Sequence, residues 1–345
     1  MERGERRLSS MEGNVGDALK LIIQIPCYNE AATLPVTLAT LPREVPGVDC
    51  VEWLIIDDGS EDDTARVAKD YGVDYVVRHA RNLGLARAFL TGLDASLQLG
   101  AGVIVNTDAD NQYSAKDIPA LVAPIIDGRA EIVVGARPIE SIEHFSPVKK
   151  LLQRLGSWAV RVASNTDVAD APSGFRAISA EAARRLMVFT DYTYTLETII
   201  QAGQKNMAIT SVAVHVNPDL RSSRLVRSTW YYVRRNMVTI VRIFMIYRPV
   251  RFFGYFGSAL FSIGVLIGCR FLWYYSRGHG NGHVQSLILA AIFLGMGFQT
   301  CLVALLADLC AANRRLIEDV RSRVHEISAQ RSNGTLNKYT VGSRR

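Results

Sequence analysis

Two long apolar stretches near the C-terminal end constrain this chain more than any other feature. They run over residues 252–275 and 284–312 and consist mainly of Phe, Leu, Ile, Gly and Ala. As a helix with ~1.5 Å of rise per residue, each stretch is long enough to cross the ~30 Å hydrocarbon layer of a bilayer. Residues 276–283, which connect them, are too few to form a domain. The pattern therefore predicts a transmembrane helical hairpin with both ends on one side.

Basic residues flank this predicted hairpin. The net charge is +6, and its surplus lies in residues 221–251 and in a tail, residues 313–345. Because Lys and Arg collect on the cytoplasmic side, both flanks are expected in the cytoplasm. Residues 221–251 mix Arg with Trp230 and Tyr247, which predicts an amphipathic juxtamembrane helix in the headgroup layer. Anionic lipid is then the expected partner, and nucleic acid is not.

The N-terminal end gives no sign of export. Residues 1–19 form a polar extension without the apolar core of a signal peptide, so the domain that follows is expected to stay in the cytoplasm. The five cysteines show no paired spacing and no nearby histidine ligands. The sequence therefore predicts neither a disulfide framework nor a zinc site.

Residues 20–220 alternate short apolar runs with helical patterns. The runs that begin at Leu21, Val51 and Gly102 contain little polar alternation, which is typical of strands covered on both faces by helices. This rhythm predicts an α/β domain with a mostly parallel, Rossmann-like sheet. Polar residues gather where these strands end, and ligands of open α/β sheets bind at that edge.

The most informative polar group is Asp108-Ala109-Asp110, directly after the fourth strand and followed by Gln112. Two carboxylates one residue apart can present oxygen atoms to a hard cation such as Mg²⁺ or Mn²⁺. Such an ion would neutralise the charge that builds on a leaving diphosphate. Short acidic turns are also common on surfaces, but the position after a buried strand favours the metal site.

Two further polar groups follow the first and second strands. Asp57 and Asp58 precede Ser60, which is a predicted helix cap, so their carboxylates stay available for a base or a ribose. Pro26 to Glu30 end the first strand in the same way.

Residues 146–165 have apolar side chains at helical spacing between basic ones. Leu155, Trp158 and Val162 share one face, and Arg154 and Arg161 supply the charge. The pattern predicts either a helix in the membrane interface or an ordinary packed surface helix.

Taken together and in order, these motifs resemble the family 2 glycosyltransferases, which have a GT-A fold. The motifs are Pro26 to Glu30, Asp57 to Ser60, Arg81 to Ala88, Asp108 to Gln112, Val134 to Arg137 and Ser173 to Ala177. The helices that follow are similar to the branch that includes dolichol-phosphate mannose synthase and bacterial polyprenyl-phosphate glucosyltransferases. This resemblance implies a nucleotide-sugar donor, a Mg²⁺ or Mn²⁺ cofactor and a polyisoprenyl phosphate acceptor, and it leaves a homo-oligomer open.

The resemblance also implies roles for individual residues. It assigns the metal and donor diphosphate to Asp108, Asp110 and Gln112, and the nucleotide to Pro26, Tyr28, Glu30, Asp57, Asp58 and Asn82. It assigns the phosphates of donor and acceptor to Arg137 and Arg176, and the acceptor phosphate also to Arg221, Ser223 and Arg224. The last three depart from the family's Arg-x-Gly-x-Ser-Lys loop, because the glycine is absent and arginine replaces lysine.

The acceptor decides how much acid-base chemistry the site needs. A phosphomonoester has a second pKa near ~6, so its oxygen can attack the anomeric carbon without a general base, with inversion. A hydroxyl acceptor would need a base, and Asp170 is the candidate. A catalytically silent membrane scaffold and a processive polysaccharide synthase are the alternatives, and the synthase is disfavoured because no Gln-x-x-Arg-Trp segment is present. A dehydrogenase is disfavoured because no Gly-x-Gly-x-x-Gly follows the first strand.

Overall fold

The computed structural model describes residues 18–138, 147–186, 194–218, 238, 241–242, 245, 247–278 and 284–340. At 147–153, 314–315, 318–319 and 321–340 it describes the course of the helix and not the side chains. The chain divides into two compact units. The first comprises Met1–Ser146 and Thr166–Ser223, and the second comprises Pro147–Asn165 and Arg224–Arg345.

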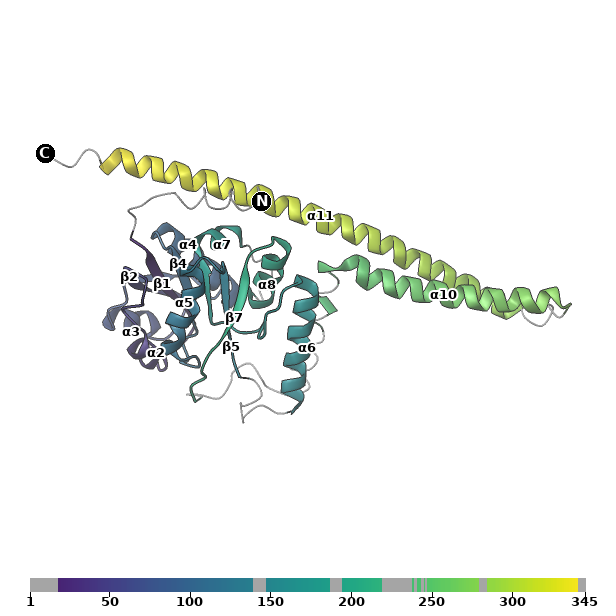
Figure 1. Cartoon of the computed structure of the whole chain (residues 1–345), viewed down its shortest axis with the longest axis horizontal. Helices are drawn as coiled ribbons and strands as arrows, with labels where there is room; N and C mark the ends of the chain where they lie inside the picture. The colour runs from purple at the N-terminus through teal and green to yellow at the C-terminus, as the bar shows by residue number, and fades with distance from the viewer. Residues whose placement is uncertain are drawn as a thin grey trace. The chain divides into compact units, whose positions relative to one another are not determined.

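The first unit is built on one sheet with the strand order β3-β2-β1-β4-β6-β5-β7 (Figure 1). Six strands run in the same direction, and β6 is antiparallel to its neighbours β4 and β5. The predicted mostly parallel α/β sheet is therefore confirmed. The strands are β1 (Lys20–Cys27), β2 (Cys50–Asp57), β3 (Tyr75–Arg78), β4 (Val103–Asn106), β5 (Ile132–Ala136), β6 (Arg176–Ser179) and β7 (Ile209–Ala213).

Helices cover this sheet in the way the apolar strands require. Residues 21–23 of β1 and all four residues of β4 are buried, as expected for strands between two helical layers. Phe89 and Leu93 of α4 are buried on the helix face that covers β1 and β2. The helices are α2 (Leu34–Thr40), α3 (Thr64–Asp70), α4 (Leu85–Gln98), α5 (Ile118–Ile126), α7 (Ala180–Arg185) and α8 (Tyr194–Gln204), with a 3-10 turn at Ala115–Asp117.

The second unit contains α6 (Pro147–Ser164), α10 (Pro249–Ser276) and α11 (Val284–Thr340). Pro249 begins α10, where the missing N–H of proline costs nothing. α10 and α11 pack against each other where glycines let the backbones approach closely. A Cβ on Gly257 would lie 2.8 Å from Cys301 Sγ, and one on Gly297 would lie 2.6 Å from the backbone N of Phe261.

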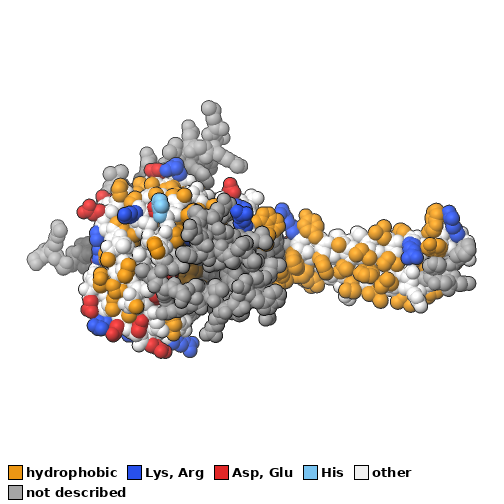
Figure 2. Space-filling view, turned by 90° about the horizontal axis from the view of Figure 1, so that it is seen from below, with side chains coloured by type: hydrophobic (Ala, Val, Ile, Leu, Met, Phe, Trp, Pro, Cys, Tyr) orange, Lys and Arg blue, Asp and Glu red, His pale blue; other side chains and the backbone are white. Residues whose placement is uncertain are grey.

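Pro249–Ser276 and Val284–Asn313 are long and apolar enough to cross a membrane, with mean hydropathies of 1.8 and 2.2. Hydrophobic side chains gather over the surface of this helical pair (Figure 2). The prediction of two apolar helices after an α/β domain is confirmed.

Candidate active site

The loops after β1 and β2 are tied together at the C-terminal edge of the sheet. The backbone N–H of Asn29 donates to Ser60 Oγ at 2.9 Å, and the N–H of Glu61 donates to Asn29 Oδ1 at 2.9 Å. Asn29 has a φ of 53°, a left-handed conformation that asparagine tolerates better than most residues. The two motifs that the sequence placed at strand ends therefore form one surface.

A cavity of about 610 Å³ opens on this surface. Gly59 has a φ of 71°, and a Cβ there would lie 2.4 Å from the carbonyl carbon of Arg81, so only glycine lets the two loops meet. Of the predicted nucleotide residues, Tyr28 and Asn82 line the cavity. Its full lining is Tyr28, Gly59, Ser60, Glu61, Arg78, His79, Ala80, Arg81 and Asn82.

The other predicted nucleotide residues lie behind this lining. Asp58 is buried, and its two carboxylate oxygens accept the N–H groups of Leu83 at 2.9 Å and Gly84 at 2.8 Å. Its Oδ1 also lies 2.7 Å from His79 Nδ1. Asp58 therefore shapes the loop that walls the cavity.

Asp57 is fully buried and pairs with Arg78, a residue of the cavity wall, at 3.1 Å. Pro26 is buried at the end of β1, and Glu30 accepts a hydrogen bond from Thr33 Oγ1 at 2.6 Å. Of these three residues, Asp57 supports the cavity wall through Arg78.

The Asp108 to Gln112 turn begins two residues after β4, as the sequence predicted. Both carboxylates are half-buried, and Asp110 Oδ1 accepts the N–H of Gln112 at 3.1 Å. Burial and the neighbouring Asp110 raise the pKa of Asp108 to about 7, against the opposing effect of Arg137 and Arg176.

Two adjacent carboxylates in a partly dry site are costly to ionise together, and a divalent cation removes that cost. No third His, Cys, Asp or Glu completes a protein cage among the residues that the structure describes. The donor set therefore suits a hard cation that takes its other ligands from water and phosphate oxygens, as Mg²⁺ does.

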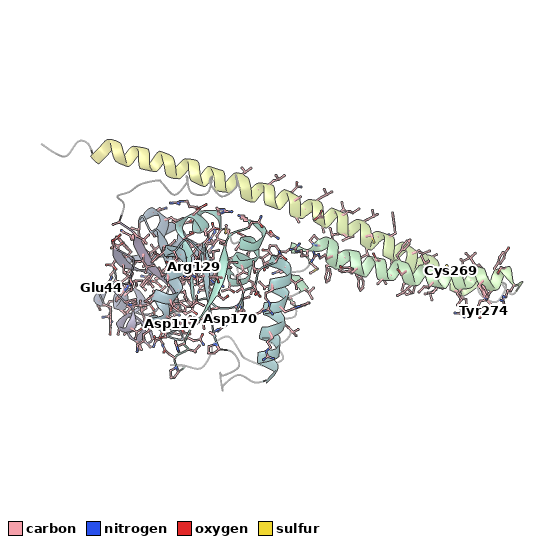
Figure 3. The ribbon with its side chains drawn as sticks, in the orientation of Figure 1. Glu44, Asp117, Arg129, Asp170, Cys269 and Tyr274 are labelled. Carbon is pink, nitrogen blue, oxygen red and sulfur yellow. The ribbon has the colours of Figure 1, made fainter. Side chains whose placement is uncertain are left out.

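Arg137 and Asp170 form a buried ion pair beside this turn. Arg137 donates to Asp170 from Nε at 2.7 Å, from Nη2 at 3.2 Å and from the backbone N–H at 3.3 Å. Asp170, labelled in Figure 3, is 1% exposed. Within the described part of the chain no acceptor faces Arg137 Nη1. Nη1 therefore has two N–H groups without an acceptor among the described residues.

Arg176, predicted from the sequence to contact a phosphate, is the first residue of β6. Its guanidinium is fully buried, and all five N–H groups have acceptors. These acceptors are the carbonyl oxygens of Ala171, Ser173 and Thr195 and the hydroxyl of Thr198. The side chain of Arg176 thereby connects residues 171 and 173 to α8. To contact a phosphate as predicted, Arg176 would have to break one of these hydrogen bonds.

The sequence analysis missed a buried polar network next to the Asp108 to Gln112 turn. Gln24 Nε2 donates to Asn106 Oδ1 at 2.9 Å, and Asn106 Nδ2 donates to the Gly174 carbonyl at 2.9 Å and to Tyr194 Oη at 3.1 Å. A Cβ on Gly174 would lie 3.2 Å from both carboxylate oxygens of Asp108. An amide inside each of two otherwise apolar strands is the signal that could have revealed this network.

Tyr113 was missed as well. It is buried, its ring stacks on Phe175 with centroids 5.0 Å apart, and its hydroxyl accepts the N–H of Gly174 at 3.2 Å. Arg221, Ser223 and Arg224, predicted to contact the acceptor phosphate, lie outside the described residues.

Comparison with known proteins identifies the family of this chain. Residues 22–187 match Glycosyl transferase family 2. The chain is 30% identical to the undecaprenyl-phosphate mannosyltransferase of Micrococcus luteus over 175 residues, 49% of this chain and 70% of that protein. It is 31% identical to a UDP-N-acetylglucosamine–dolichyl-phosphate N-acetylglucosaminyltransferase of Methanococcus voltae over 181 residues, 47% of this chain and 70% of that protein.

A solved structure supports the predicted GT-A fold. Glucosyl-3-phosphoglycerate synthase from Mycobacterium tuberculosis, in complex with phosphoglyceric acid, aligns with a TM-score of 0.51 at 22% identity, covering 65% of this chain and 80% of that chain. A second structure of that enzyme, with Mn²⁺, UDP and glucosyl-3-phosphoglycerate, aligns with a TM-score of 0.50 at 22% identity over 64% of this chain and 80% of that chain. The chain therefore belongs to glycosyl transferase family 2, as an enzyme that transfers a sugar from a nucleotide sugar.

Proposed function

We propose that this enzyme transfers a hexose, with inversion, from a UDP- or GDP-linked donor to a polyisoprenyl phosphate such as undecaprenyl or dolichyl phosphate. The reaction takes place at the cytoplasmic face of a membrane that the two apolar helices span. The observation that carries the proposal is that one chain joins a family 2 site to a hairpin of two apolar helices. A polyisoprenyl phosphate keeps its long hydrocarbon tail in a bilayer, and two membrane-spanning helices would hold the enzyme at that bilayer.

Relatives support the acceptor. The proteins of Micrococcus luteus and Methanococcus voltae are named for transfer to undecaprenyl phosphate and dolichyl phosphate. A third relative, 26% identical over 192 residues, is a polyprenol monophosphomannose synthase of Mycolicibacterium smegmatis.

Asp108, Asp110 and Gln112 would hold Mg²⁺ or Mn²⁺ together with the donor diphosphate. The bound ion would supply charge neutralisation to the leaving nucleoside diphosphate. The cavity between Tyr28 and Asn82 would bind the nucleoside, with Asp57 and Asp58 fixing its walls. The Mycobacterium tuberculosis enzyme, which shares the fold, was solved with both Mn²⁺ and UDP bound.

Arg137 is the residue best placed for the acceptor phosphate. The ion pair with Asp170 fixes its guanidinium, and Nη1 is the end that can reach an anion. The same ion pair argues against a hydroxyl acceptor, because a carboxylate that already accepts three hydrogen bonds is a poor general base. A phosphate oxygen needs no such base. Arg221, Ser223 and Arg224 are proposed to add charge around the same phosphate.

α6 and residues 221–251 are proposed to lie in the membrane interface. α6 falls into the same compact unit as the apolar helices, and Arg248 Nε donates to its Ala163 carbonyl at 3.1 Å. On the described part of α6, Leu155 is 40% exposed and Trp158 is 52% exposed, while Val160 is buried. Exposed apolar side chains on a basic helix fit the headgroup layer and its anionic lipids.

The test is transfer of radiolabelled sugar from a panel of UDP- and GDP-sugars into organic-extractable lipid. Membranes that contain the protein are compared with membranes that contain the Asp110→Ala variant, with Mg²⁺, with Mn²⁺ and with EDTA. We expect metal-dependent label in a mild-acid-labile lipid for the wild type and none for the variant. Water-soluble or polymeric product alone would refute the polyisoprenyl phosphate acceptor and would make Asp170 the base to test.

A further inference from the structure

The four residues after β7, residues 214–217, lie along the turn that carries the proposed metal ligands. Val216 forms an isolated antiparallel bridge with Tyr113. The backbone N–H of Asn217 donates to the carbonyl oxygen of Gln112 at 2.9 Å. The chain that leaves the last strand of the sheet is therefore joined to the turn that follows β4.

The side chain of Asn217 adds two more bonds to the same turn. Its Nδ2 donates to the carbonyl oxygen of Asn111 at 2.9 Å and to that of Tyr113 at 3.4 Å. Asn111 has a φ of 57°, so the backbone here leaves regular structure and its carbonyls depend on a side-chain donor. One amide group thus binds the backbone on both sides of Gln112.

These bonds fix the orientation of Gln112 relative to the two carboxylates. Its carbonyl is held by Asn217 and its N–H by Asp110 Oδ1 at 3.1 Å. Metal ligands need their orientation fixed by groups behind them, and loss of such a group typically lowers metal affinity ~10–100-fold. Asn217 supplies that support from outside the turn.

We propose that Asn217 is a positioning residue for the metal and donor site. It does not bind the ion, but it holds the backbone of the turn so that Asp108, Asp110 and Gln112 face the same point. This inference rests on the metal-dependent function proposed above and adds a residue to which neither the sequence motifs nor the family resemblance gave a role.

The test is a Mn²⁺ titration of the purified full-length protein followed by electron paramagnetic resonance, with UDP present, in the wild type and three variants. Asn217→Ala removes the amide. Asn217→Asp keeps its shape but faces a carboxylate oxygen toward two carbonyl oxygens. We expect both substitutions of Asn217 to weaken Mn²⁺ binding ~10-fold or more. The Mn²⁺ concentration needed for half-maximal transfer should rise by the same factor. Saturating Mn²⁺ should restore most of the transfer rate.

Asn206→Gly is the matched control. Asn206 also has a left-handed φ, 51°, but it is exposed in the turn between α8 and β7 and lies outside the site. Its replacement should leave Mn²⁺ affinity unchanged. Rescue by Mn²⁺ separates positioning from misfolding, because a variant that fails to fold does not regain activity with more metal.

If Asn217→Ala and Asn217→Asp bind Mn²⁺ as tightly as a metal-dependent wild type, the inference is refuted. If Asn217→Ala does not fold, Asn217→Asp is compared with Asn217→Gln, which keeps an amide donor. Equal Mn²⁺ affinities of these two variants would also refute the inference. A wild type that neither binds nor needs Mn²⁺ would instead refute the metal part of the proposed function.

Discussion

Replacing Asp108 with asparagine should inactivate the enzyme and at the same time stabilise the metal-free protein. Burial and Asp110 raise the pKa of Asp108 from 3.8 to about 7. The folded protein therefore favours the protonated carboxyl, and ionising it in the fold costs free energy that the unfolded chain does not pay. This cost is absent at low pH, grows as the pH rises above 3.8 and is complete above pH 7.

The size of the effect follows from the two pKa values. A difference of about 3 units corresponds to about 4 kcal/mol of unfolding free energy at pH 8 and to about 2 kcal/mol at pH 5. Asparagine has a similar shape and no charge to lose, so Asp108→Asn should gain this stability. For a domain of this size, the extra 2 kcal/mol between the two pH values corresponds to roughly 4–8 °C in Tm.

The assay is thermal unfolding of the detergent-solubilised full chain in EDTA, followed by intrinsic fluorescence between pH 5 and pH 8. The Tm advantage of Asp108→Asn should widen as the pH rises. Asp127→Asn, which changes a solvent-exposed carboxylate paired with Arg129, is the control and should show no such widening. Added Mn²⁺ should raise the Tm of the wild type and leave that of Asp108→Asn unchanged. A variant less stable than the wild type at pH 8, or a constant difference across pH, would refute the reasoning.

Three further changes test other parts of the structure. Gly174→Ala would put a methyl group 3.0 Å from Tyr194 Oη and 3.2 Å from both oxygens of Asp108, so we expect initial rates of transfer to fall at least ~10-fold. Full activity would contradict the close approach. Arg176→Lys should lower the unfolding free energy by about 3 kcal/mol in denaturant titrations, because a buried guanidinium that makes five hydrogen bonds loses most of them. An unchanged stability with reduced activity would support the predicted phosphate role. Gly297→Leu should disrupt the packing of α10 on α11 and reduce the protease-resistant hairpin in membranes, whereas Gly295→Leu, with nothing within 4 Å of its Cβ, should not.

The sequence predicted those features that depend on local patterns. Apolar runs gave the buried strands β1, β2 and β4, and the position of Asp108 after β4 follows from where that run ends. The two apolar helices follow from composition and length alone. Tyr28 and Asn82, which the family resemblance assigned to the nucleotide, both line the cavity.

The direction in which a charged side chain points could not be predicted in this way. Arg176 and Arg137 both stand in short motifs, yet Arg176 donates to the carbonyl oxygens of Ala171, Ser173 and Thr195, whereas Arg137 Nη1 has no acceptor among the described residues. That difference arises when β6 inserts between β4 and β5 and brings α8 beside it, and no local pattern encodes the insertion. Asn217 is a similar case, since its partners lie more than a hundred residues earlier in the chain.

The proposed reaction has to bring together two substrates of opposite solubility. A nucleotide sugar carries a diphosphate that does not enter hydrocarbon, and a polyisoprenyl chain does not leave it. The proposed transfer between them would occur at the boundary, with the sugar supplied from the water side and the phosphate presented at the membrane surface. A phosphate already carries its nucleophilic oxygen, so the site needs cations and fixed N–H groups more than a base. The paired acids at Asp108 and Asp110, the Arg137 guanidinium fixed by its ion pair and the Asp170 carboxylate occupied by that pair all fit the proposed reaction.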